Sequence, residues 1–123
     1  MRRDKQRLLD YLGHILEAIE RIDRYTEDMD EVEFLQNEMA QDAVIRNFEI
    51  IGEASHNIEY HFPEFAAAHP ELPLAFAYQM RNAVAHGYFK VDLEIVWKTI
   101  QNDVSGLYTR VQEAHQGLPG APP

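Results

Sequence analysis

Four polar side chains of types that enzymes use for proton transfer and for phosphate binding stand in one short stretch: Arg81, Asn82, His86 and Tyr88. Histidine can act as a general base or acid near neutral pH, and arginine presents a fork of donors that matches a phosphate group. Asn82 and His86 are four residues apart, so a helix places them on one face. Arg81 and His86 are about 140° apart around a helix, so they converge only if the helix end is distorted or a second subunit brings them together. The simpler alternative is a solvated helix end, where a neutral imidazole caps the last carbonyl groups.

The elements before this stretch are predicted from apolar residues that recur at helical spacing. The spacing predicts a helix over residues 4–24, a short helix through Phe34 and Leu35, and a longer helix over residues 38–58. Asp28 or Asp30 is the expected N-cap of the short helix. The residues expected to face inward on the two long helices are Leu8, Leu12, Ile15, Leu16, Ile19, Ile22, Val44, Ile45, Phe48, Ile51, Ala54 and Ile58.

The elements around and after the stretch are predicted from prolines, glycines and a further apolar face. Three prolines predict a loop over residues 61–73 with at most a short helical turn at 64–68. Pro73 suits the first turn of the helix that carries the polar stretch, and Gly87 ends that helix. A last helix begins at Asp92 as N-cap and turns inward Leu93, Val96, Trp97, Ile100, Val104, Leu107 and Val111. We therefore expect an all-α, four- to five-helix up-and-down bundle in a single domain, residues 1–116, with a disordered tail over residues 117–123.

The composition is that of one folded domain. Of 123 residues, 46% are hydrophobic and 26% are charged. The absence of cysteine excludes disulfides, thiol catalysis and zinc sites built on thiolates. No apolar run is long enough to cross a bilayer, and the charged N-terminal residues are unlike a signal peptide. We therefore expect a soluble, cytoplasmic protein with no membrane partner.

The net charge of -10 would argue against a nucleic acid partner if the charge were evenly spread. It is concentrated instead in residues 25–76, which hold twelve acidic residues and one basic residue, Arg46. Residues 1–24 and 77–123 are close to neutral, and the first of these ranges begins with a basic cluster of Arg2, Arg3, Lys5 and Arg7. The average charge therefore says little about the surface around Arg81 and His86.

The order Arg-Asn-three residues-His-Gly-Tyr over residues 81–88 resembles the R-x4-H-x-Y signature of HEPN-domain toxins (HepT-like), the ribonuclease partners in MNT/HEPN toxin–antitoxin pairs. Other parts agree in order: Ile-Ile-Gly-Glu-Ala at 50–54, the proline-rich loop that ends at Pro73, and Tyr88-Phe89 followed by Val96-Trp97. The resemblance covers roughly residues 5–112. Leu74 stands where a tryptophan often follows the proline, and the C-terminal tail has no counterpart.

The resemblance implies a type VII-like toxin that is a metal-independent endoribonuclease without a cofactor. Arg81 and His86 are then the catalytic pair, and Asn82 and Glu53 support them. Cleavage of RNA without a metal needs a base for the 2′-hydroxyl, an acid for the leaving 5′-oxygen and a cation for the phosphorane. One chain supplies one such histidine, so we expect a C2 homodimer with the site at its interface, as in HEPN families. The expected substrate is RNA and not DNA.

Tyr88 acquires a second role from the resemblance. In this family the MNT nucleotidyltransferase antitoxin transfers AMP to the tyrosine at this position and so neutralises the toxin. A bulky phosphodiester beside His86 would block the cleft and repel RNA. Without the resemblance, Tyr88 and Phe89 are a pair that packs the loop onto the bundle.

A metal site and two other functions are the alternatives to this interpretation. Glu53 and His56 have the Glu-x-x-His spacing of di-iron bundles, but no second copy exists, so no metal site is expected. Glu53 is expected to pair with a cation, for which Arg81 is the best candidate. The other functions are a non-catalytic helical binding module that partners a nucleotidyltransferase, and a plain helical scaffold.

The acidic segment 25–76 then acquires a hypothetical role. If it lies opposite the cleft, RNA approaches along the site and the basic N-terminal cluster. The acidic surface would limit nonspecific RNA binding or serve as a dock for a basic surface of the antitoxin.

Overall fold

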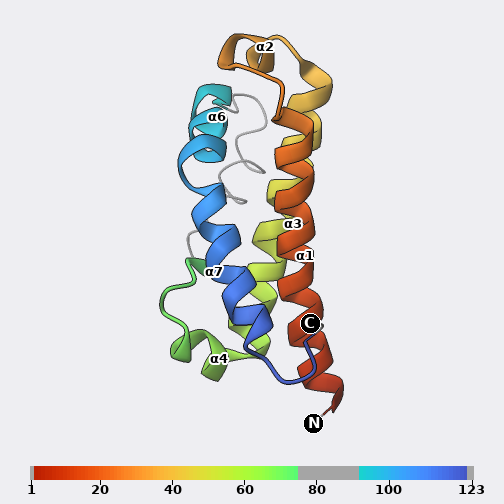
Figure 1. The fold of residues 1–123 in the computed structure, drawn as a ribbon, viewed down its shortest axis with the longest axis vertical. Helices are drawn as coiled ribbons and strands as arrows, with labels where there is room; N and C mark the ends of the chain where they lie inside the picture. Colours follow the sequence, from red (N-terminus) through yellow and green to blue (C-terminus); the bar gives the residue numbers. More distant parts are fainter. Residues whose placement is uncertain (1, 75–91, 122–123) are drawn as a thin grey trace.

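Helices form the framework of the molecule. The computed structural model describes residues 2–74 and 92–121, and within these ranges it contains helices and no strand. The helices are α1 (Arg2–Thr26), α2 (Glu31–Leu35), α3 (Glu38–His61), α4 (Pro63–Ala68), α6 (Leu93–Asn102) and α7 (Val104–Gln116). α1 runs the length of the molecule, α2 turns the chain, α3 returns beside α1, and α6 and α7 lie along this pair (Figure 1). The predicted all-α up-and-down bundle is confirmed.

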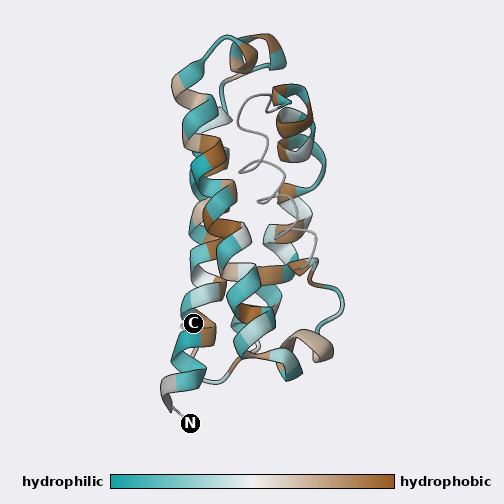
Figure 2. Cartoon of the chain, turned by 180° about the vertical axis from the view of Figure 1, so that it is seen from behind, coloured by the Kyte–Doolittle hydropathy of each residue, from teal (hydrophilic) through white to brown (hydrophobic). Residues whose placement is uncertain are grey.

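One apolar core joins the long helices. α1 packs against both α3 and α7, and α2 packs against α3 and α6. The core residues with no solvent exposure are Leu12, Ile15, Ala18, Ile19, Ile22, Phe34, Val44, Phe48, Ile51, Ile58 and Val111. Each large side chain among them stabilises the fold by about 1.5–3 kcal/mol relative to an exposed position. Apolar and polar residues alternate along the helices (Figure 2), as expected when each helix buries one face.

The ends of the predicted helices are close to those observed. Three residues expected to face inward, Leu16, Ile45 and Leu93, are only half-buried, and two of them, Leu16 and Leu93, pack against the core. α3 continues past Ile58 to His61 because no residue before Pro63 interrupts it. The residue before that proline, Phe62, has left the helical region (φ -132, ψ 57), as a following proline demands. α4 then fills the place of the predicted helical turn.

Side-chain caps fix where the helices begin. Asp30 accepts a hydrogen bond from the N–H of Glu33 at 2.8 Å, which confirms it as the N-cap of α2. Asp92 likewise caps α6, as predicted. Asn37, which the sequence analysis did not single out, caps α3 by accepting from the N–H of Ala40 at 3.0 Å. Each cap satisfies a backbone donor that the helix leaves unpaired.

The predicted single helix after Asp92 is wrong: the structure has two helices with a junction at Asp103. Asn102 and Asp103 are poor helix formers, and the Thr99 hydroxyl donates to the carbonyl of Ile95 at 2.8 Å, a contact that bends helices. The N–H of Asp103 still donates to the carbonyl of Thr99 at 2.9 Å, so the change of direction is local. The apolar face therefore continues across the junction.

The C-terminal segment is described as far as Ala121. Gly117 ends α7, and Leu118 lies half-buried against the core. Gly120 has φ +88, a left-handed conformation that suits glycine, and the N–H of Ala121 donates to the carbonyl of Leu118 at 3.2 Å. The segment therefore forms a turn in the structure.

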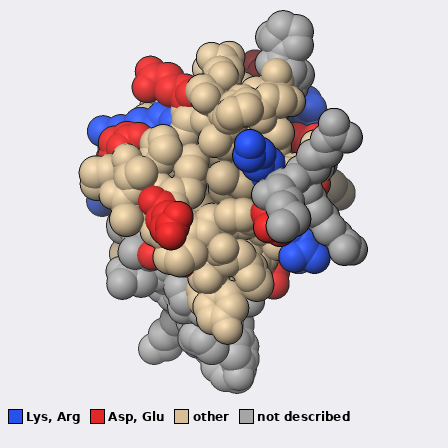
Figure 3. Space-filling view, turned by 90° about the horizontal axis from the view of Figure 1, so that it is seen from below, with Lys and Arg blue, Asp and Glu red and all other residues tan. Residues whose placement is uncertain are grey.

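The acidic residues gather at the end of the bundle formed by α2. Seven of the twelve from residues 25–76 belong to the stretch from Glu27 to Asp42, and α6 begins at the same end with Asp92 and Glu94 (Figure 1). The opposite end, seen in Figure 3, carries dispersed charges of both signs on a largely uncharged surface. None of the described helices has the length and apolar character needed to traverse a membrane.

Candidate functional site

The residues predicted to carry the chemistry lie in the interval between Leu74 and Asp92. Arg81, Asn82, His86 and Tyr88 are outside the described residues, as is the helix predicted to end at Gly87. The structure therefore shows the elements that flank and support this segment.

The chain is fixed to the core on both sides of the segment. Before it, Leu72 and Leu74 are 5% and 3% exposed. After it, α6 begins at its cap and presents Trp97, whose ring centroid lies 5.3 Å from that of Phe34. The described residues on both sides of the segment thus contribute to the apolar core of the bundle.

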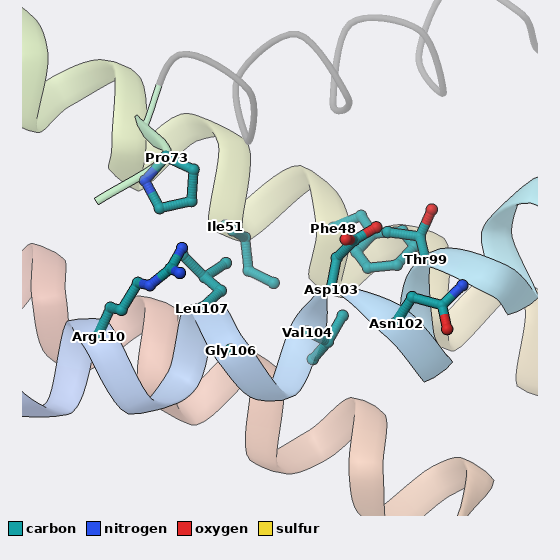
Figure 4. A pocket seen from close by; sticks show the side chains of 10 residues that line it. All are labelled: Phe48, Ile51, Pro73, Thr99, Asn102, Asp103, Val104, Gly106, Leu107 and Arg110. Atoms are coloured by element: carbon teal, nitrogen blue, oxygen red, sulfur yellow. The ribbon is translucent and has the colours of Figure 1, made fainter. Parts of the chain in front are cut away.

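A cavity of about 350 Å³ lies between α3, Pro73 and the junction of α6 with α7 (Figure 4). Phe48, Ile51 and Leu107 supply apolar walls, and Arg110 extends from α7 toward Pro73. The other residues that line it are Thr99, Asn102, Asp103, Val104 and Gly106. A guanidinium beside apolar walls is a combination that binds a phosphate together with a sugar or base. Spacing alone did not single out Arg110, because its surroundings come from three separate elements.

Glu53 is the only predicted supporting residue that the structure describes. It lies exposed on α3 between the buried residues Gly52 and Ala54. Because the carboxylate is exposed, an ion pair there carries little of the desolvation penalty that opposes a buried ion pair. Its pairing with Arg81 stays a prediction.

The Glu53–His56 spacing is not part of a metal cluster among the described residues. No group of three or more histidine and carboxylate side chains in these ranges is placed to hold a metal ion. His56 is exposed on α3, and its ring stacks on that of Tyr60 with centroids 6.2 Å apart. The structure therefore gives His56 an aromatic neighbour.

The described groups with shifted pKa values lie near the contact between α1 and α7. The Tyr108 hydroxyl donates to Glu20 Oε1 at 3.4 Å. Partial burial raises the pKa of Asp23, and the nearby Glu20 carboxylate adds to this effect. Partial burial and Glu20 also raise the pKa of Tyr108. The Tyr108–Glu20 hydrogen bond joins two helices, and raised pKa values make the stability of the fold depend on pH.

Comparison with known proteins identifies the class. Residues 15–114 match the family model described as Ribonuclease HepT-like. The chain is 44% identical over 98 residues to the "Probable ribonuclease HepT" of Thermococcus cleftensis, which covers 80% of this chain and 86% of that protein. It is 37% identical over 102 residues to a "Putative RNase" of Methanocaldococcus jannaschii, covering 83% and 91%.

A third relative is a longer protein. The "Gamma-glutamylcyclotransferase and putative RNase" of Methanocaldococcus jannaschii is 41% identical over 108 residues, which is 88% of this chain and 47% of that protein. No solved structure matches. The helical bundle and the family match define an RNase of the HEPN type. The chain belongs to the HepT-like ribonuclease family.

Proposed function

We propose that this chain is a metal-independent endoribonuclease and the toxin of a type VII-like toxin–antitoxin pair. The observation that carries the proposal is the family match over residues 15–114, which spans the Arg81–Tyr88 stretch with its arginine, histidine and tyrosine at the signature spacing. "Probable ribonuclease HepT", the printed name of one relative, supports the same activity.

His86 and Arg81 supply the chemistry. One imidazole takes the proton of the 2′-hydroxyl as its oxygen attacks phosphorus, and an imidazolium gives a proton to the 5′-oxygen as the P–O5′ bond breaks. The products are a 2′,3′-cyclic phosphate and a 5′-hydroxyl. The Arg81 guanidinium binds the phosphorane oxygens, where negative charge accumulates. Asn82, four residues before His86, holds the imidazole tautomer or a phosphate oxygen.

A C2 homodimer completes the site. A single chain brings one histidine of this stretch, whereas the reaction uses one base and one acid, so two copies of His86 across one cleft meet the requirement. A dimer also relieves the angular separation of Arg81 and His86 on one helix.

A nucleotidyltransferase antitoxin is the proposed partner. It transfers AMP to the Tyr88 hydroxyl, and the added phosphodiester blocks the cleft and repels RNA. The acidic end around α2 offers a surface complementary to a basic partner, which supports docking there.

RNA cleavage in the presence of EDTA tests the activity. The wild-type chain is expected to cleave RNA, and Arg81→Ala and His86→Ala are each expected to lose about 100-fold or more of the rate. His14→Ala, which removes an exposed histidine of α1, is the matched control, and circular dichroism confirms that each variant is folded. Cleavage that survives in His86→Ala would refute the assignment. A folded wild type that cleaves nothing but binds a nucleotidyltransferase would be the non-catalytic binding module instead.

A further inference from the structure

A row of aromatic rings crosses the junction of α3 and α4. Along α3 the ring of Tyr60 stacks on that of His56 with centroids 6.2 Å apart, and it meets the ring of His61 edge-on at 4.9 Å. On α4 the ring of Phe65 stacks on that of His69 at 4.1 Å. These five residues are referred to as the aromatic strip.

A hollow joins the two halves of the aromatic strip. It measures about 380 Å³ and is lined by His61, Phe62, Pro63, Glu64 and Phe65. The His69 Nδ1–H donates to the carbonyl of Phe65 at 3.0 Å, which fixes the orientation of that ring. The hollow thus lies between His61 and Phe65, one ring from each half of the strip.

Tyr60 is unusually open to solvent for a large aromatic side chain. It is 73% exposed, whereas Tyr25, the other exposed tyrosine in residues 2–74 and 92–121, is 37% exposed. The ring contributes little to the core, yet its two imidazole neighbours limit its freedom. An exposed ring held in this way is suited to contact a ligand.

We propose that the aromatic strip binds single-stranded RNA by stacking bases on Tyr60 and its neighbours, outside the residues that cleave the chain. This inference rests on the proposed function, which makes RNA the substrate. Nucleobases stack on aromatic side chains in sequence-tolerant fashion, and histidine rings take part in such contacts.

The charges around the strip favour contact through base faces. Glu59 and Glu64 lie beside it, so phosphates must point away from it. Lys5 and Arg7, both exposed, lie at this end of the bundle, because the ring of Tyr11 on α1 contacts that of Phe62 at the end of α3. In this binding mode the basic side chains on α1 contact the RNA phosphates, while the aromatic strip stacks on the bases.

A protein partner is the less favoured occupant of this surface. The exposed aliphatic residues among those described, Val32, Met39 and Ile95, all lie on α2, the start of α3 or α6, at the opposite end. The strip instead combines rings with imidazole nitrogens, which suits hydrogen-bonding bases more than an apolar protein face.

Binding of a fluorescein-labelled, 2′-O-methyl RNA of about 20 nucleotides tests the inference, because this probe lacks the attacking hydroxyl and is longer than one stacking site. Tyr60→Ala is expected to raise Kd about tenfold in fluorescence anisotropy. Tyr60→Phe keeps the ring and is expected to restore binding to within about twofold of wild type. Tyr25→Ala is the matched control at the other end of the bundle and is expected to leave the Kd unchanged.

Two further readouts separate stacking from other roles. The ratio of the Kd values of Tyr60→Ala and wild type is expected to stay constant as salt is raised, because base stacking releases no counterions. With cleavable RNA, Tyr60→Ala is expected to raise KM and leave kcat unchanged, as for binding that is equal in the ground and transition states.

The outcomes distinguish this inference from the proposed function. A folded Tyr60→Ala variant that binds as tightly as wild type, or a Tyr60→Phe variant that binds as weakly as Tyr60→Ala, would overturn the stacking role. A Tyr60→Ala variant with unchanged RNA binding and an altered oligomeric mass would show a protein interface instead. Wild-type protein that binds the methylated RNA but never cleaves the unmodified one would refute the proposed function and leave the stacking surface intact.

Discussion

Replacing Asp92 by alanine removes the N-cap of α6, directly after the segment that contains Arg81 and His86. The Asp92 carboxylate accepts hydrogen bonds from the backbone N–H groups of Glu94 at 3.1 Å and Ile95 at 3.2 Å. Loss of an N-cap costs about 1 kcal/mol, and loss of a negative charge at the positive end of a helix costs about 0.5 kcal/mol. We therefore expect Asp92→Ala to lower the free energy of unfolding by about 1–1.5 kcal/mol, or the Tm by roughly 3–6 °C.

Trp97 makes this loss measurable at the helix concerned. It is the single tryptophan of the chain, it lies on α6, and it is 9% exposed against Phe34. Urea unfolding followed by tryptophan fluorescence therefore reports on α6. All variants must be compared at one protomer concentration, because a dimer couples stability to concentration. Asp92→Asn keeps a cap oxygen without the charge and is expected to lose only about 0.5 kcal/mol.

Two results would refute this reasoning. If Asp92→Ala is as stable as wild type, the cap oxygen contributes nothing. If Asp92→Asn is destabilised as much as Asp92→Ala, the stabilisation comes from the negative charge of Asp92 and not from its cap hydrogen bonds. At a temperature where every variant is folded, Asp92→Ala is also expected to lower kcat/KM for RNA, because positioning errors near catalytic groups are costly. Asp30→Ala removes the comparable cap of α2 and is expected to spare kcat/KM.

Two other predictions concern a carboxylate in the bundle and the proposed modification site. The folded state raises the pKa of Asp23, so the stability that its protonation provides is present below its ordinary pKa and is lost as the pH rises through the folded pKa. Asp23→Asn is therefore expected to be more stable than wild type by a few tenths of a kcal/mol at about pH 7 but not at about pH 3. Urea unfolding at both pH values measures this difference in stability. An equal difference at the two pH values would contradict the prediction. Tyr88→Phe is expected to retain RNA cleavage and to lose labelling when a cognate nucleotidyltransferase and radioactive ATP are added. Undiminished labelling of Tyr88→Phe would exclude this tyrosine as the acceptor.

The helices were predictable because burial must follow the helical period. Leu12, Ile15 and Ile19 recur at the spacing that keeps one face inward, and all three have no exposure in the structure. Asp30 and Asp92 were predictable as caps because a short carboxylate just before an apolar repeat can reach unpaired backbone donors. The junction at Asp103 was not predictable in this way. The apolar repeat passes through it unbroken, and the contact of Thr99 with the Ile95 carbonyl is a choice of rotamer that periodicity does not reveal.

The candidate site was likewise predictable only in part. Arg81 and His86 could be singled out by residue type and spacing, because RNA cleavage without a metal needs a proton-transfer group and a cation. Their convergence was not predictable, since an ideal helix would hold them about 140° apart, and the sequence does not say whether a distorted helix end or a second chain closes this angle. The cavity beside Arg110 and the aromatic strip were not predicted from the sequence, for a different reason. The cavity is lined by α3, Pro73 and the α6–α7 junction, which only packing brings together, whereas the strip crosses the break between α3 and α4 at Phe62. The four-residue spacings of His56 with Tyr60 and of Phe65 with His69 were the local signals of the strip.

The charge distribution decides whether a protein with a net charge of -10 can bind RNA at all. α1 has 25 residues and therefore spans about 37 Å, and the acidic cluster around α2 lies at one end of it. At physiological salt the Debye length is about 8 Å, so the repulsion from that cluster is screened by several Debye lengths before it reaches Lys5 and Arg7 at the other end. RNA that meets the bundle there experiences mainly the local charges. At low salt the screening length grows, so under the proposed binding mode repulsion from the acidic end favours approach of RNA to the N-terminal end of α1 and the aromatic strip. The proposed contact of RNA with the aromatic strip is therefore compatible with a net charge of -10.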